Sequence, residues 1–122
     1  RSYVAAPEPL ATNLIVKQGD SSFSELVEET RSGLIVNSIG YTFHLVPERG
    51  YCNIVSNTPA LVVENGVVVG QVPRVTFSGE LAETLMKIEG IGKELHQSIW
   101  VGSMVAFSPH LRIKDMIVGN PG

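Results

Sequence analysis

The stretch LVVENGVVVG, residues 61–70, places two valine-rich runs on either side of Asn65-Gly66. Asn-Gly between apolar runs is a strong signal for a β-hairpin, because both residues tolerate the positive φ angles of a type I′ turn. Residues 61–63 and 67–69 are apolar at consecutive positions, which is typical of strands that are buried on both faces. The stretch therefore predicts a hairpin in the interior of a β-rich fold.

Two helices are predicted, one on each side of this hairpin in the sequence. In SSFSELVEETRSG, residues 21–33, Ser22 and Glu25 have the spacing of a capping box, and Gly33 is placed to end the helix in a left-handed conformation. In the second, Ser78 is the expected N-cap. The apolar stripe of this second helix is spaced by 4, 3, 3 and 4 positions, and its members are Leu81, Leu85, Ile88, Ile91 and Leu95.

The remaining apolar segments read as strands, at residues 12–19, 72–77, 99–107 and 110–118. Residues 34–46, interrupted at Gly40, read as two strands or one bent strand, while residues 47–59 are rich in turn formers. Many hairpin-linked strands and two helices predict an α+β fold, predominantly an antiparallel β-sheet or barrel. Residues 1–10, rich in alanine and proline, are expected to form a linker or extended arm, and residues 11–122 one domain.

Composition limits the function classes. The net charge is −3 and no run of Lys or Arg is present, which argues against a nucleic-acid surface. A single cysteine excludes an internal disulfide framework and fits a reduced, cytoplasmic setting. No segment approaches the ~20 apolar residues of a membrane span, so no membrane partner is expected.

Few residues could hold a metal ion. A zinc site needs three or four converging ligands, and the thiol and imidazole supply is Cys52, His44, His96 and His110. No two of these have the i, i+4 spacing, and His-Glu-x-x-His is absent. For each histidine an ordinary structural position is the favoured interpretation, as is a buried, inert thiol for Cys52.

The sequence contains equally few signals for a catalytic nucleophile or a phosphate-binding loop. Gly-x-Ser-x-Gly is absent, and helix capping accounts for Ser78 without a nucleophilic role. The glycine-lysine turn at residues 90–95 follows the second predicted helix, so its backbone N–H groups would not converge on a phosphate. An exposed strand edge that adds a peptide as a further strand is physically reasonable.

The order of the motifs is more specific than any one of them. TNLIVKQGDSSFSELVEETRSGLIV (12–36), the segment from LVVENGVVVG to GIGKEL (61–95) and SPHLRIKDMIV (108–118) together resemble the C-terminal part of the TldD/PmbA family. The features that carry this resemblance most strongly are Glu64-Asn65-Gly66, Val72-Pro73, the Ser-Gly turn at 78–79 and Ile91-Gly92.

This resemblance implies a role in a known class of proteins. The family is known as zinc-dependent metallopeptidases that process peptides in the cytoplasm, and as candidate modulators of DNA gyrase. TldD-type members carry a His-Glu-x-x-x-His helix upstream of this region, and a late cysteine completes their zinc site. PmbA-type members lack the helix and act as partner subunits, in homodimers or heterodimers.

The chain departs from the TldD-type pattern at the position of the late cysteine that completes the zinc site. Residues 98–109, SIWVGSMVAFSP, contain no cysteine, and Ser103 lies near the expected position. Serine is a poor zinc ligand beside a thiolate. We therefore expect no catalytic residue and no metal site in this chain, with Cys52 and Ser103 only weak candidates, and zinc in the whole protein only if the upstream motif is present.

These observations predict a C-terminal domain that gives scaffold, peptide-binding and dimer surfaces to a metallopeptidase and is inactive alone. The alternative is a domain of a non-catalytic, PmbA-like partner subunit that binds peptide or another protein.

Overall fold

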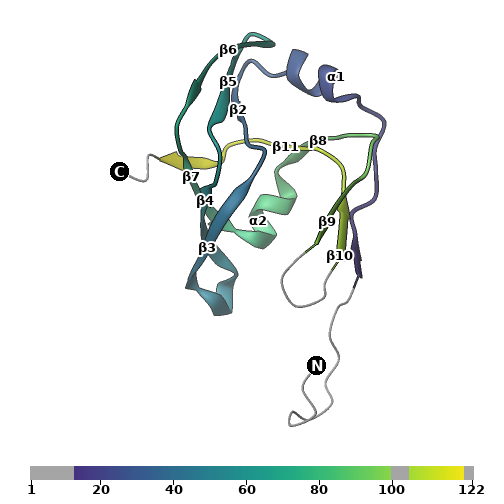
Figure 1. Cartoon of the computed structure of the whole chain (residues 1–122). Helices are drawn as coiled ribbons and strands as arrows, with labels where there is room; N and C mark the ends of the chain where they lie inside the picture. Colours follow the sequence, from purple (N-terminus) through teal and green to yellow (C-terminus); the bar gives the residue numbers. More distant parts are fainter. Residues whose placement is uncertain (1–12, 100–104, 120–122) are drawn as a thin grey trace.

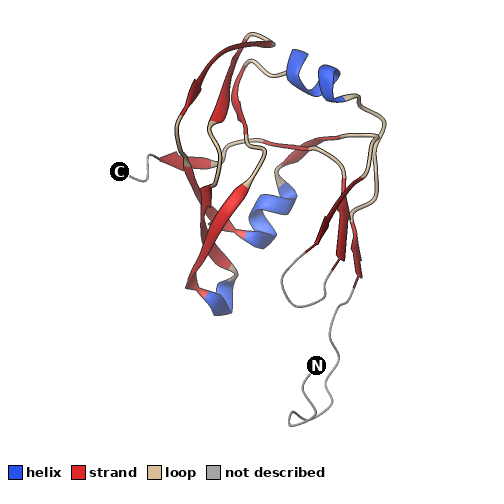
Figure 2. Ribbon diagram, in the orientation of Figure 1, coloured by secondary structure: helices blue, strands red, loops and turns tan. Residues whose placement is uncertain are grey.

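The computed structural model describes residues 13–99 and 105–119, which fold into four small sheets with two short α-helices (Figures 1 and 2). The predicted arm at residues 1–10 lies outside the described residues, as do residues 100–104 of the strand expected at 99–107. The helices are α1 (Phe23–Glu28) and α2 (Leu81–Met86), and a 3-10 turn, η1, spans Pro47–Arg49.

The four sheets have different strand orders. The hairpin sheet is β2 (Ser32–Ile35), β5 (Ala60–Glu64) and β6 (Val67–Val72), and the central sheet is β12 (Ile117–Gly119), β7 (Thr76–Glu80), β4 (Tyr51–Ser56) and β3 (Ile39–Val46). The third sheet is β1 (Asn13–Ile15), β10 (Val105–Ser108) and β9 (His96–Ile99), and a ribbon pairs β11 (Leu111–Ile113) with β8 (Ile88–Ile91).

The predicted fold class is confirmed. Every strand pair in the described residues is antiparallel except β1 with β10, which is parallel. The sheets in this part of the chain stay separate and do not close into a barrel. The fold is therefore α+β, and its sheets are open rather than closed into a barrel.

The Asn65-Gly66 hairpin is confirmed, with φ angles of 50° and 79° at its two turn residues. Its burial follows the prediction in only one strand. On β5, Ala60 and Val63 are buried, but on the outer strand β6 Val67 is 61% exposed and Val69 56%. The prediction of a fully interior hairpin is wrong for β6, because within residues 13–99 and 105–119 this strand pairs with β5 alone and lies at the edge of its sheet.

The hairpin turn is bonded to the chain just after α1. The Asn65 N–H donates to Arg31 O at 2.7 Å and the Gly66 N–H donates to Thr30 O at 2.8 Å. A Cβ atom on Gly66 would lie 2.6 Å from Glu28 O, closer than real Cβ contacts. Gly66 is therefore required both by its positive φ and by the close approach of two backbones.

Helix α1 starts as predicted and ends earlier. The Ser22 Oγ accepts from the Glu25 N–H at 3.1 Å and also donates to Glu25 Oε1 at 3.2 Å, so the carboxylate bonds to the hydroxyl instead of the N-cap backbone. The helix ends at Glu28 with a right-handed C-cap at Glu29. Gly33 is not the predicted left-handed stop, because it lies within β2, paired with Val63.

The prediction of the second helix is wrong for the second half of the segment. Helix α2 ends at Met86, and the stripe residues Ile88 and Ile91 instead pair with Ile113 and Leu111 in the β8–β11 ribbon. Glycines at 90 and 92 disfavour a continued helix, by about 1 kcal/mol each relative to alanine. Neither helix of the described residues has the length and apolar character to cross a membrane.

Ser78 is not the N-cap of α2. It lies in β7, where its Oγ donates to Asn53 Oδ1 at 2.9 Å on the neighbouring strand. The N-cap is Glu80, which makes no capping bond with its side chain and pairs with Arg49 instead. The segment 47–59, read as turns from its composition, contains β4, an inner strand of the central sheet.

The segment at residues 110–118, predicted as one strand, forms two. Strand β11 belongs to the ribbon and β12 to the central sheet. The chain changes direction at Asp115, which has a φ of 52°. A left-handed conformation at an aspartate is uncommon but tolerated, because its short polar side chain can bond locally.

We expect Gly66→Ala to lower the free energy of unfolding by about 1–3 kcal/mol, because it forces a Cβ into a positive φ and against Glu28 O. Gly70→Ala is the matched control, since a Cβ there meets nothing within 4 Å. Chemical denaturation of both variants checks this; equal stability would show that the turn does not depend on its close contact with α1.

A second prediction concerns Ser56, which is buried in β4. Its Oγ accepts from the Val75 N–H at 3.0 Å, and Val75 is itself buried. Ser56→Ala leaves that N–H without its acceptor, so we expect a loss of about 1–3 kcal/mol. Ser24→Ala, at an exposed position of α1, should change stability by less than about 0.5 kcal/mol in the same urea titration.

Candidate functional site

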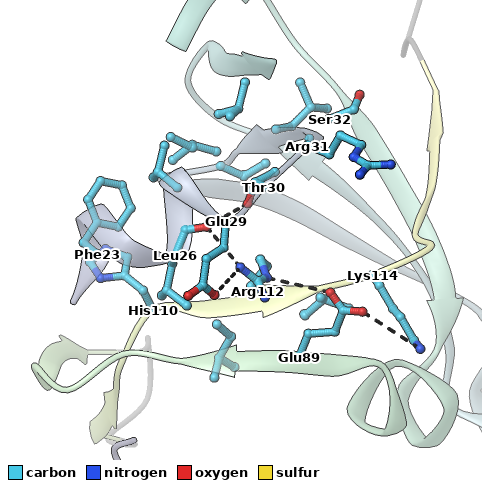
Figure 3. Close-up of a pocket in the computed structure, with 18 of the residues that line it drawn as sticks. Phe23, Leu26, Glu29, Thr30, Arg31, Ser32, Glu89, His110, Arg112 and Lys114 are labelled. Carbon is cyan, nitrogen blue, oxygen red and sulfur yellow. Dashed lines mark hydrogen bonds and ion pairs between the residues drawn. The ribbon is translucent and has the colours of Figure 1, made fainter. Parts of the chain in front are cut away.

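Two cavities lie on either side of α1. The larger, ≈ 620 Å³, lies between α1, β2 and β11, and Figure 3 shows most of the residues that line it. The smaller, ≈ 450 Å³, lies between α1 and the β5–β6 hairpin. Phe23 and Val27 line both, so α1 forms a shared wall. Both volumes fall in the range of about 300–1,000 Å³ that is usual for ligand sites.

Helix α1 is held over the ribbon by a single buried side chain, Leu26. A Cβ atom on Gly90 of β8 would lie 2.5 Å from Leu26 Cδ2, so the leucine side chain packs directly against this glycine. The Thr30 Oγ1 donates to Leu26 O at 2.7 Å, which satisfies one of the carbonyls at the helix end. The position of α1 therefore depends on β8 as well as on the hairpin turn.

Arg112 on β11 connects three segments at the floor of the larger cavity (Figure 3). Its Nη1 donates to Leu26 O at 3.3 Å and to Glu29 Oε2 at 3.2 Å. Its Nε lies 3.7 Å from Glu89 Oε2 on β8. Because the side chain is only 23% exposed, this partly buried cation is balanced by carboxylates from both α1 and the ribbon.

Two of the three histidines meet at one end of this cavity. The His110 ring centroid lies 4.6 Å from that of Phe23 and 4.7 Å from that of His96, which is edge-on to it. Burial lowers the pKa of His110 below its ordinary value, and the neighbouring His96 lowers it further, while Glu94 acts in the opposite direction. His110 is therefore biased towards the neutral form, and His96 belongs to strand β9, not to the helix end that was predicted.

The other candidate ligands lie elsewhere. Cys52 is half-buried in β4, with its Sγ 3.7 Å from Gly50 O, and the β3–β4 register places it opposite His44. Ser103 lies outside the described residues. Among residues 13–99 and 105–119, no three His, Cys, Asp or Glu side chains form a group that could hold a metal ion. His44 and Cys52 therefore belong to strands of the central sheet, whereas His96 and His110 lie at the end of the larger cavity.

Sequence reasoning missed Arg112 and its two carboxylates. Arg112 alternates with Leu111 and Ile113, which is the pattern of an ordinary solvent-facing position. Its partner Glu29 is 83 residues away in the sequence. No local signal marks such a contact, because it exists only once α1 and the ribbon are packed together.

The family model for the PmbA/TldA metallopeptidase C-terminal domain matches residues 1–120. A metalloprotease from Methanothermobacter thermautotrophicus is 28% identical over 118 residues, which cover 88% of this chain and 25% of that protein. A metalloprotease from Methanocaldococcus jannaschii is 28% identical over 88 residues, covering 72% of this chain and 19% of that protein. The chain thus spans a quarter or less of the length of these curated relatives.

Two solved structures share the fold. TldE from Thermococcus kodakarensis has a TM-score of 0.72 at 21% identity, over 87% of this chain and 23% of that one. A Thermotoga maritima protein described as a candidate modulator of a DNA gyrase has a TM-score of 0.74 at 24% identity, over 88% of this chain and 24% of that one. Because the family model matches nearly the whole chain, the chain belongs to the TldD/PmbA family and corresponds to the metallopeptidase C-terminal domain of that family.

Proposed function

We propose that this chain gives a cytoplasmic TldD/PmbA-type metallopeptidase its scaffold, a peptide-binding surface and a dimer surface, while zinc and catalysis come from the rest of the protein. The family match and the names of the two archaeal relatives support the metallopeptidase class. The observation that carries the peptide-binding role is the cavity of ≈ 620 Å³ beside Arg112.

Arg112 supplies hydrogen-bond donors to this cavity. A guanidinium has five N–H donors. Nη1 and Nε face Leu26 O, Glu29 and Glu89, and within the described chain Nη2 has no acceptor. The Nη2 atom is not buried, so its two N–H donors are open to water and can instead bind an oxygen acceptor that a ligand provides.

The charges around the cavity indicate what kind of acceptor fits. The lining residues carry three positive and three negative side chains, namely Arg31, Arg112 and Lys114 against Glu29, Glu89 and Asp115. When His110 is neutral, the lining has no net charge. A strongly charged ligand therefore gains little electrostatic attraction from this cavity. A peptide carbonyl on Arg112, with an apolar side chain against Leu26, Leu34 or Ile113, matches this lining.

The metal implied by the family does not fit this part of the chain. The described residues offer no group of three ligands, and the sequence has Ser103 where a thiolate is expected. Hydroxyl oxygen is a harder and weaker ligand for zinc than thiolate sulfur. We therefore assign no metal-dependent step to these residues.

Ser103 also supports a second candidate, a non-catalytic PmbA-like subunit that binds peptide or another protein beside an active TldD-type partner. A partner subunit does not need the late cysteine, and this chain lacks it. The two candidates differ in whether His-Glu-x-x-x-His is encoded upstream. That motif would support the peptidase, and its absence would support the partner subunit.

We predict that the purified chain binds no stoichiometric zinc and does not hydrolyse an unfolded peptide. Metal analysis by mass spectrometry and a fluorogenic casein assay, each with and without chelator, check this. Zinc near one equivalent, or hydrolysis that the chelator abolishes, would show that the chain carries a metal centre of its own.

Peptide binding provides a separate prediction. Arg112→Lys keeps the cation beside Glu29 and Glu89 but removes the Nη2 donors. One hydrogen bond contributes about 0.5–1.5 kcal/mol, so the affinity for a labelled apolar peptide should fall up to about tenfold in fluorescence anisotropy. Arg74→Lys, the same change at an exposed position away from the cavity, should leave affinity unchanged. Equal affinity of wild type and Arg112→Lys would rule out this site.

A further inference from the structure

The Asn65-Gly66 turn is chemically reactive as well as structural. In an Asn-Gly sequence the glycine nitrogen can attack the side-chain amide carbon of the asparagine, because glycine has no side chain to obstruct the approach. Asn65 is exposed, and within residues 13–99 and 105–119 its side-chain amide makes no hydrogen bond. The amide carbon is therefore accessible, and the position of the Gly66 nitrogen decides whether the reaction occurs.

The reaction is a deamidation in two balanced steps. The Gly66 nitrogen forms a bond to Asn65 Cγ and loses its proton, while the amide nitrogen leaves Cγ as ammonia and takes up a proton. Water then adds to one carbonyl carbon of the succinimide ring and breaks the bond from that carbon to the ring nitrogen. Attack at the side-chain carbonyl gives aspartate, and attack at the main-chain carbonyl gives isoaspartate, whose backbone runs through Cβ and Cγ. Asparagine counts among the thermolabile residues of proteins.

The folded turn blocks the first step. The Gly66 N–H donates to Thr30 O at 2.8 Å, so the attacking nitrogen is held towards the end of α1 with its proton in place. The Asn65 N–H donates to Arg31 O at 2.7 Å. A Cβ on Gly66 would lie 2.6 Å from Glu28 O. Ring closure requires both turn residues to rotate, and the two hydrogen bonds and this close packing oppose that rotation.

We propose that Asn65 is a deamidation site that the contact between the turn and the end of α1 keeps closed, and that it reacts only when this contact opens. Local opening is fast compared with succinimide formation, so the rate of deamidation follows the population of the opened form. The reaction withdraws the opened form irreversibly. Deamidation therefore records how often the turn leaves α1, and it does not depend on peptide binding.

The products disfavour a return of the turn to α1. An isoaspartate lengthens the backbone of the turn by one atom, and a two-residue type I′ turn has a defined geometry at both residues. Each product also adds a carboxylate next to Glu64, while the backbone of Glu28 lies against Gly66, so like charges gather at the turn. Because α1 is a wall of both cavities, a reaction at residue 65 alters the shape of both.

The first test compares the folded chain with the same chain unfolded in guanidinium chloride, both at neutral pH. Peptide mapping by mass spectrometry follows the product at residue 65. The folded chain should react at least about tenfold more slowly, because two hydrogen bonds must open first. Hydrogen exchange of the Gly66 amide gives an independent measure of the same opening, and its protection factor should match the retardation within about threefold.

A matched pair of serine variants tests the dependence on α1. Ser22→Ala removes the N-cap of this short helix, so it should accelerate deamidation of the folded chain by about fivefold. Ser24→Ala, the same change at an exposed position of the helix, should leave the rate unchanged. Circular dichroism confirms that both variants are folded. If Ser22→Ala does not fold, the wild-type comparison with hydrogen exchange still decides the question.

The isoaspartyl form, separated by ion exchange, should unfold at a lower denaturant concentration than the wild type. Asn65→Asp adds the charge without lengthening the backbone, so its midpoint should lie between the two.

Four results would overturn the proposal: equal rates in the folded and unfolded chain, a retardation that differs from the Gly66 protection factor, equal rates in folded Ser22→Ala and Ser24→Ala, or an isoaspartyl form as stable as the wild type.

Discussion

The contact between the Asn65-Gly66 turn and the end of α1 is the constraint on which the rest of this domain depends. Two backbone N–H groups of the turn bond to Thr30 O and Arg31 O, at a distance that leaves no room for a Cβ on Gly66. This contact fixes the hairpin sheet relative to α1. Because α1 is a wall of both cavities, their shapes depend on Gly66, which itself lines the smaller one.

Local signals in the sequence predicted local structure well. Asn65-Gly66 gives the turn and Ser22 caps α1, because both depend on residues within a few positions. The helix expected through Leu95 fails for the opposite reason. Ile88 and Ile91 satisfy a helical stripe, but they pair with Ile113 and Leu111 of β11, 25 and 20 residues further along the chain. Tertiary pairing overrides helical spacing where glycines already weaken the helix.

The candidate site was beyond sequence reasoning for the same physical reason. Arg112 gains its role only when α1 brings Leu26 O and Glu29 over the ribbon. His96 and His110 meet through the turns that place β9 beside the start of β11, and neither spacing nor motif connects them. The family resemblance succeeded because it rests on the order of local motifs, which survives even where individual segments were assigned the wrong secondary structure.

The valine run of β6 shows what an apolar pattern specifies and what it leaves open. Consecutive apolar residues indicate that both faces of a strand are covered, and on β5 the described chain supplies that cover. On β6 it does not, although the strand is as apolar as its neighbour. Exposed valines on an uncharged edge favour association, since pairing satisfies the backbone and removes apolar surface from water. The apolar pattern therefore specifies the strand and its pairing with β5, and the described residues cover β5 but leave the valines of β6 exposed.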